Sequence, residues 1–405
     1  MDIGTRIVFI LAWLFFCFSI LPVNAKILDE IVLEHEETPF QTEVIQEDYI
    51  ENNTETDTNP QTMTVHETLH DKIHDIFNLE VSDNEHIEAL LENILTKKIE
   101  KGPLENIGIR GLWRGGLTET FTGGHNSTKM NYDIMETRLH GSFKNKKTSF
   151  VITTRYLPQK EFTFMQNLFS DVYIKHRFNK HAVLTLGNTR THTGEEGSWS
   201  ELLIPFYARS QISRQFGNIR KVGARLSGEY SLMDYDIALN SSGTYFTSFF
   251  PGAEFCGWVN FKPLGKTDGR YGTLKIGGGI TSGRRHFNYN CVGAYVSYKY
   301  KKFKADFEIA NGDGYNGRMG AANIHARGYY TTIYYDLTKK LQLVARFDDF
   351  IPNCRDSNHH TREYTAGVNY FIKGQALKLI LNYTLREDSI AGNSHKIMIG
   401  TQIVL

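Results

Sequence analysis

The sequence predicts an all-β protein: a 16-stranded antiparallel transmembrane β-barrel preceded by a short helical or disordered N-terminal region. Three observations lead to this fold class. After Asn106, runs of roughly ten residues alternate between apolar and polar side chains, with turn residues between them. No run in this region is apolar for twenty residues, which excludes transmembrane helices there. The alternation continues through residues 395–405 to the terminal Leu405, where a soluble protein seldom places an apolar strand.

Residues 1–25 have the features of a secretory signal peptide. Arg6 supplies a basic start, an apolar core follows, and Val23-Asn24-Ala25 offers a small-residue cleavage site. A retained membrane anchor is the alternative, but the apolar run is short for a full span of about 20 residues. We therefore expect a cleaved signal that directs the chain to the bacterial cell outer membrane.

The net charge of zero conceals two oppositely charged regions. Residues 1–105 carry 6 Lys/Arg and 22 Asp/Glu, whereas residues 106–405 carry 39 Lys/Arg and 23 Asp/Glu. Within the acidic part, residues 27–60 have too little apolar surface to fold and are predicted to be disordered. Residues 65–77 and 84–101 show apolar side chains at helical spacing and are predicted to form two short helices. The predicted domains are the signal peptide at 1–25, an acidic periplasmic region at 26–105 and the barrel at 106–405.

Sixteen alternating runs are expected to form the barrel strands. They are residues 107–118, 132–143, 148–157, 168–178, 181–190, 219–230, 233–241, 256–263, 271–283, 291–300, 302–310, 327–336, 339–348, 361–371, 376–386 and 395–405. Connections after the even-numbered strands are short, and those after the odd-numbered strands are mostly long. This rhythm is typical of outer-membrane barrels, which have short periplasmic turns and longer external loops. A soluble β-sandwich or lipocalin-like barrel is the alternative, and it does not explain the one-sided rhythm.

Strand parity assigns the charged side chains to the inner face. In residues 376–386, Leu379 and Leu381 share the lipid face, so Lys378 and Asn382 face the lumen. A charge on the lipid face costs roughly 2–4 kcal/mol near the bilayer midplane, which supports the assignment. The acids expected to face inward are fewer than the bases. The strand-borne bases expected to line the lumen are Arg110, Arg114, Arg138, Arg155, Lys221, Arg225, Lys275, Lys304, Arg346, Lys378 and Arg386.

The long connection at residues 191–218 adds further bases. Arg209 and Arg214 occur there with Ser210 and Ser213, and no acid lies between Glu201 and Glu229. If this connection folds into the channel, these four residues are candidates for the narrowest anion-binding site, because guanidinium groups suit phosphate oxygens. The alternative is an external loop that faces anionic lipopolysaccharide.

One short segment resembles a zinc-protease motif. His66-Glu67-Thr68-Leu69-His70 has H-E-x-x-H spacing, and two such histidines on a helix can hold zinc. The segment lacks a surrounding domain, and an acidic helix gathers such residues by chance. We therefore expect no enzyme activity, no metal site and no cofactor.

Several segments resemble one known family. They are "LGNTRTHTGEEG", "YARSQISRQFGNIRKVGARLSGEY", "DYDIALNSSGTYF", "YKYKKFKADFEIANGDGYNG" and "TREYTAGVNYFIKGQALKLILNYT". Together with the strand-and-turn pattern of 106–405, they are similar to the phosphate-selective porin O and P family. The resemblance implies a trimeric outer-membrane channel with a basic constriction formed partly by an inward-folded loop. Arg209, Arg214, Lys221 and Arg225 are the best candidates for that role.

The function predicted from these features is passive diffusion of anions, with phosphate or polyphosphate the leading substrate. A 16-stranded barrel leaves an aqueous channel, and basic side chains along it attract anions. The expected partners are small inorganic anions, outer-membrane lipid and lipopolysaccharide, and two further copies of the chain; no nucleic acid is expected. Two alternatives stay open: a non-selective general porin, and a structural or adhesive barrel that contacts the cell wall through residues 27–105.

Overall fold

The computed structural model describes residues 95–156, 168–243, 251–267, 269–285, 287–314, 324–355 and 359–405. All of them belong to the second of two units, which begins at Met63. The predicted signal peptide, the stretch 27–60 and the H-E-x-x-H segment at 66–70 lie outside the described residues. Within the described part of the chain, no helix is long and apolar enough to cross a membrane.

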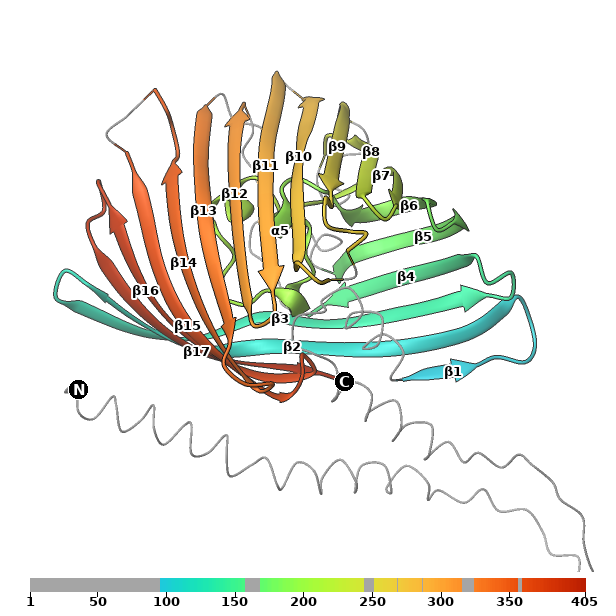
Figure 1. Ribbon diagram of the computed structural model, residues 1–405, viewed down its shortest axis with the longest axis horizontal. Helices are drawn as coiled ribbons and strands as arrows, with labels where there is room; N and C mark the ends of the chain where they lie inside the picture. The colour runs from blue at the N-terminus through green and yellow to red at the C-terminus, as the bar shows by residue number, and fades with distance from the viewer. Residues whose placement is uncertain are drawn as a thin grey trace, which may run out of the picture. The chain divides into compact units, whose positions relative to one another are not determined.

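Sixteen antiparallel strands form a closed ring (Figure 1). Each strand from β2 to β17 pairs with its neighbours in sequence, and β17 pairs with β2 from Ser394↔Thr122 to Val404↔Leu112. The predicted 16-stranded antiparallel barrel is therefore confirmed, including its closure by the last strand. The strands are β2 (Leu104–Thr122), β3 (His125–Phe143), β4 (Thr148–Arg155), β5 (Phe169–Asn179), β6 (Ala182–Arg190), β7 (Arg220–Glu229), β8 (Met233–Ser241), β9 (Ala253–Phe261), β10 (Thr273–Arg284), β11 (Asn288–Tyr300), β12 (Phe303–Asp313), β13 (His325–Asp336), β14 (Leu341–Ile351), β15 (Thr361–Lys373), β16 (Leu377–Asp388) and β17 (Ser394–Val404).

The two faces of the ring have opposite polarity. On β12, Asp306 and Glu308 are buried inside the barrel, whereas Phe307 and Ile309 are exposed on its outer surface. Successive side chains of a strand point to opposite faces, so one strand can meet two solvents. An apolar outer face and a charged inner face are what a bilayer with an aqueous lumen requires.

The two rims differ in their connections, with exceptions to the predicted rhythm. On one rim, turns such as 144–147 and 301–302 are short, as predicted, but the β9–β10 connection spans 262–272. On the other rim, β2 and β3 continue to a tight hairpin at Gly123 and Gly124 instead of a long loop. Both glycines have positive φ, 53° and 82°, the backbone conformation that a two-residue hairpin needs.

A short additional strand precedes the barrel. The prediction of a helix through residues 84–101 is wrong at its C-terminal part, because Thr96–Lys98 form β1. This strand pairs with Asn106–Gly108 of β2, just beyond the point where β17 ends at Val404. The edge of β2 has free backbone donors and acceptors there, and their pairing outweighs a helical propensity that is weak over a few residues.

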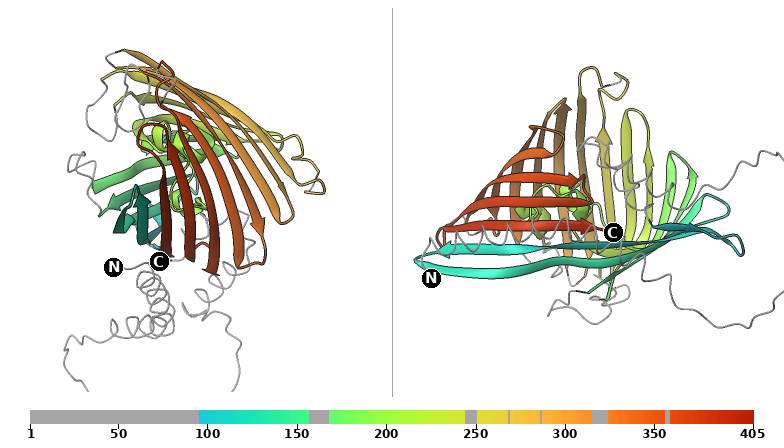
Figure 2. Two further views of the ribbon diagram at one scale, coloured as in Figure 1. Left: turned by 90° about the vertical axis from the view of Figure 1, so that its left-hand side faces the viewer. Right: turned by 90° about the horizontal axis from the view of Figure 1, so that it is seen from below.

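The long connection between β6 and β7 lies inside the ring (Figures 1 and 2). It contains α5 (Glu195–Ser198), the 3₁₀ turn η1 (Glu201–Leu203) and α6 (Gln211–Gln215). We call residues 191–219 the inserted segment. The prediction left open whether this connection folds inward or outward, and the structure places it in the lumen.

Candidate functional site

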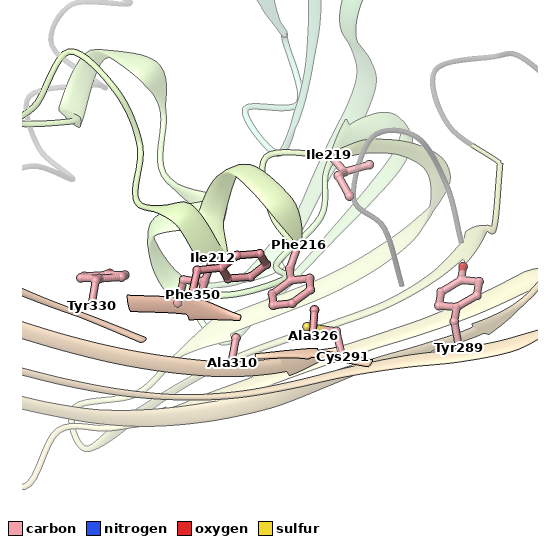
Figure 3. Packing of buried hydrophobic residues seen from close by; sticks show 9 residues of the cluster. All are labelled: Ile212, Phe216, Ile219, Tyr289, Cys291, Ala310, Ala326, Tyr330 and Phe350. Atoms are coloured by element: carbon pink, nitrogen blue, oxygen red, sulfur yellow. The ribbon is translucent and has the colours of Figure 1, made fainter. Parts of the chain in front are cut away.

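Apolar side chains hold one end of the inserted segment against the barrel wall. Ile212 on α6 and Phe216, which follows the helix directly, lie one turn apart and pack against Ala310, Ala326 and Phe350 of β12, β13 and β14 (Figure 3). Gly312 permits this packing, since a Cβ there would meet the Phe216 ring at 2.7 Å. The i, i+4 spacing on α6 therefore matches a small-residue patch on the wall.

Strand carboxylates and amides pair with backbone N–H groups of the inserted segment. Glu308 accepts from the N–H groups of Glu195 (2.8 Å) and Glu196 (3.2 Å) at the start of α5. Asp348 accepts from the N–H of Gln211 at 3.0 Å, and Asn382 accepts from the N–H of Tyr207 at 2.7 Å. Glu308 and Asp348 thus satisfy backbone donors that α5 and α6 leave unpaired at their N-termini, and Asn382 binds the chain that leads into α6.

Basic side chains on the strands also bind the inserted segment, as donors to its carboxylates and carbonyl oxygens. Lys275 pairs with Glu195 at 2.7 Å, and Arg346 pairs with Glu196 at 3.2 Å. Lys378 donates to the carbonyl oxygens of Leu202 (3.1 Å) and Ile204 (3.2 Å), and Arg114 donates to that of Glu201 (3.1 Å). These four bases, which strand parity predicted to line the pore, contact the inserted segment and hold it in place.

His192 connects the segment to two carboxylates. Its Nδ1 lies 3.0 Å from Asp236, its Nε2 lies 3.3 Å from Glu195, and its ring stacks on Trp258 at a centroid distance of 5.2 Å. Burial tends to lower the pKa of His192, but the hydrogen bonds and charges of Asp236 and Glu195 prevail and raise the pKa to about 9. The imidazole is therefore cationic at neutral pH and makes two charge-assisted contacts.

Five arginines gather around three carboxylates where the segment meets β3–β7. Arg138 and Arg220 flank Asp171 at 3.3 and 2.7 Å. Arg190 and Arg209 flank Glu201 at 3.3 and 3.1 Å. Arg155 pairs with Glu136 at 3.3 Å and also acts on Glu201 through its charge. We call Arg138, Arg155, Arg190, Arg209 and Arg220, with Asp171, Glu136 and Glu201, the arginine cluster.

The arginines govern the ionisation of Glu201. Burial tends to raise the pKa of this carboxyl, but the charges of Arg209 and Arg190 prevail and hold the pKa well below its usual range. Glu201 therefore remains anionic, and the cluster carries more positive than negative groups. Strand parity predicted that Arg138 and Arg155 line the lumen. It did not single out Arg190, which lies at the end of β6.

Other predicted site residues have partners of their own. Lys221 pairs with Glu254, and Arg225 pairs with Asp236. Arg110 lies opposite Arg138 in the register between β2 and β3, so both point into the lumen.

The four loop candidates do not share one site. Arg209 donates to the carbonyl of Trp199 at 2.7 Å and remains within the segment. Ser210 caps α6 by accepting from the N–H of Ser213 at 3.4 Å. Arg214 pairs instead with Glu363 of β15 at 2.6 Å. The structure thus corrects the expectation of one joint constriction made by these residues.

Two cavities lie on opposite sides of the segment. The larger, about 800 Å³, is at the short-turn end, where Lys304 contacts Trp199 at 4.9 Å. The smaller, about 410 Å³, is at the other end and includes Arg214. Bases outnumber acids in the larger cavity: Arg177, Lys180, Arg225, Lys262, Lys275, Lys299 and Lys304 face Glu195, Glu229, Asp234 and Asp236.

Solved porin structures share this fold. The anion-selective porin from Comamonas acidovorans aligns with a TM-score of 0.56 at 10% identity, over 74% of this chain and 99% of that one. OmpF of Salmonella typhi, in complex with daunomycin, has a TM-score of 0.56 at 10% identity, over 76% and 100%. The outer-membrane channel DcaP of Acinetobacter baumannii has a TM-score of 0.55 at 10% identity, over 77% and 100%.

Part of the sequence also matches the model of a known protein family. No curated protein sequence matches the chain. Residues 259–404, which include β10–β17, match the family model for phosphate-selective porin O and P. Together with the porin fold, this match indicates an outer-membrane channel. The resemblance drawn from the sequence is confirmed over residues 259–404, which are similar to the phosphate-selective porin O and P family.

Proposed function

We propose that the protein is a passive outer-membrane channel that prefers anions. The arginine cluster is the observation that carries the proposal, because five guanidinium groups lie beside three carboxylates in the lumen. The excess positive charge attracts anions and repels cations, as charged rings do in other pores. The route requires no cofactor and no covalent step.

The larger cavity supports the same preference. Its seven bases and four acids give an excess of positive groups beside the inserted segment. An anion that leaves the cluster toward the short-turn rim therefore remains in a favourable potential. The transport path in this proposal runs from the smaller cavity, past the segment, into the larger one.

Phosphate is the proposed substrate class, and the proposed assembly is a homotrimer in an outer membrane with lipopolysaccharide. A guanidinium group can bind two oxygens of one phosphate at once, whereas a chloride ion offers no such pair of acceptors. The similarity to the phosphate-selective porin O and P family supports phosphate, and the shared fold with the anion-selective porin from Comamonas acidovorans supports anions in general.

One ion pair offers a matched test of the proposal. Arg155 and Glu136 lie 3.3 Å apart on β4 and β3. Arg155→Gln removes a positive group and Glu136→Gln removes a negative one, while each leaves one partner unpaired. A unit charge about 5 Å from a permeating ion changes its energy by about 0.8 kcal/mol in water, or roughly fourfold in occupancy.

Reversal potentials in a salt gradient, measured on planar bilayers, read out the effect. We expect the wild-type protein to prefer anions, Arg155→Gln to lose preference and Glu136→Gln to gain it. Equal permeability of cations and anions in all three proteins would indicate a general porin and would refute the proposal. Added phosphate should reduce chloride conductance less in Arg155→Gln than in the wild type.

A further inference from the structure

The short-turn rim is strongly basic. Across its seven connections, eleven bases accompany a single acid, Asp268; the bases are Lys144, Lys146, Lys147, Lys180, Lys262, Lys266, Arg270, Lys301, Lys302, Lys339 and Lys340. The opposite rim, leaving out the inserted segment, has four bases (Lys160, Arg285, Arg318 and Arg355) and two acids (Glu161 and Asp356). We call the eleven bases the basic rim. Its charge is a property of one end of the barrel and not of turns in general.

Most of the basic rim is open to solvent. Lys301 and Lys302 are exposed between β11 and β12, and Lys339 and Lys340 are exposed between β13 and β14. Lys262 is half-buried and pairs with Glu229 and Asp234. The exposed bases repel one another at this spacing, so an anionic partner would stabilise the rim.

The chain that precedes the barrel reaches this same rim. β1 pairs with Asn106–Gly108 of β2, and Lys144 of the β3–β4 turn donates to the carbonyl of Glu100 at 2.8 Å. The carbonyl of Leu95, directly before β1, accepts a hydrogen bond from the N–H of Ile109 at 3.0 Å. Because β1 is antiparallel to β2, Leu95 lies opposite Ile109, five residues along β2 from its rim end at Leu104. The chain before Leu95 is therefore joined to the barrel within a short length of strand from the basic rim.

Those residues have the complementary charge. Residues 63–94 contain eight acids and one base, Lys72; the acids are Glu67, Asp71, Asp75, Glu80, Asp83, Glu85, Glu88 and Glu92. We propose that residues 63–94 bind the basic rim of the same chain. A short tether gives an effective concentration in the millimolar range, so modest attraction suffices for binding. The interaction is a surface contact and does not depend on the proposed anion preference.

Zero-length cross-linking of the full-length protein in detergent tests the contact directly. A carbodiimide joins a carboxylate to a neighbouring lysine amine with loss of water, and mass spectrometry identifies the linked pair. We expect links from the acids of residues 63–94 to Lys301, Lys302, Lys339 and Lys340. Raising salt from 0.1 M to 1 M should reduce them severalfold, because the Debye length falls from about 10 Å to about 3 Å.

Lys129, an exposed lysine near the β2–β3 hairpin on the opposite rim, is the internal control. Lys339→Gln with Lys340→Gln should lower the remaining rim links, because part of the attraction is lost, without changing folding. Links to Lys129 as frequent as links to the rim would overturn the proposal. The proposal would also be overturned if the full-length protein in detergent gave no rim links but bound vesicles of anionic phospholipid through these lysines. That result would show that the basic rim binds lipid headgroups.

Discussion

Arg346 and Glu196 form an ion pair at 3.2 Å across 150 residues of sequence, with side chains 2% and 3% exposed. Arg346 also binds Asp348 at 2.7 Å and the carbonyl of Ala208 at 3.1 Å. Glu196 in turn accepts from the N–H of Ser210 at 2.8 Å. One strand residue of β14 therefore holds both α5 and the start of α6 in the lumen.

Removing either member of this pair should release the inserted segment. We expect Arg346→Gln or Glu196→Gln to cost about 3–5 kcal/mol in the free energy of unfolding, because the other charge stays buried without its partner. Single-channel conductance should increase and fluctuate as the segment leaves the lumen. Urea unfolding and bilayer recordings measure the two effects.

The double variant provides the control for that pair. Arg346→Gln with Glu196→Gln should cost less than the sum of the single changes, since the two side chains contact each other. Lys129→Gln, at an exposed position near the β2–β3 hairpin, should leave both stability and conductance unchanged. Strictly additive effects would show that the ion pair does not couple strand and segment.

His192 should make barrel stability depend on pH. Its folded pKa of about 9 exceeds the ordinary value of 6.5, so the folded state binds the proton more tightly. The contribution is complete below about pH 6.5, decreases as pH rises and is lost above about pH 9. From the size of this shift it amounts to about 3 kcal/mol.

Unfolding of the wild type and of His192→Gln between pH 6 and pH 10 tests this expectation. The variant should be less stable at pH 6 and should lack the decline between pH 6.5 and pH 9. His125→Gln, at an exposed position beside the β2–β3 hairpin, should keep the wild-type profile. A decline of equal size in His192→Gln would assign the pH dependence to other groups.

A charged substitution on the outer face should destabilise the barrel more, the closer it lies to the bilayer midplane. Leu381 is 45% exposed near the middle of β16, and Leu337 is 44% exposed in the β13–β14 turn. We expect Leu381→Arg to cost about 2–4 kcal/mol and Leu337→Arg about 0–1 kcal/mol when the protein folds into lipid vesicles. Similar costs at the two positions would contradict a bilayer that surrounds the middle of the strands.

Much of the barrel could be predicted from local pattern. Period-two alternation identifies a strand, and a bilayer allows only one parity for Lys378 and Arg346, so their inward direction follows without a structure. The closure of β17 on β2 follows for the same reason, because an open sheet edge cannot be satisfied in lipid. The strand at Thr96–Lys98 was mispredicted because its pairing edge on β2 belongs to another part of the chain.

The sequence by itself determined which face of each strand meets lipid and which meets water, because this depends only on the alternation of side chains within the strand. The tertiary structure alone decided which charges meet. Arg190 and Arg209 converge on Glu201, and Arg346 reaches Glu196, only because the inserted segment folds inward and the register brings distant strands beside it. These long-range contacts form only once the barrel closes. The position of a loop inside the barrel therefore cannot be predicted from the local pattern of residues.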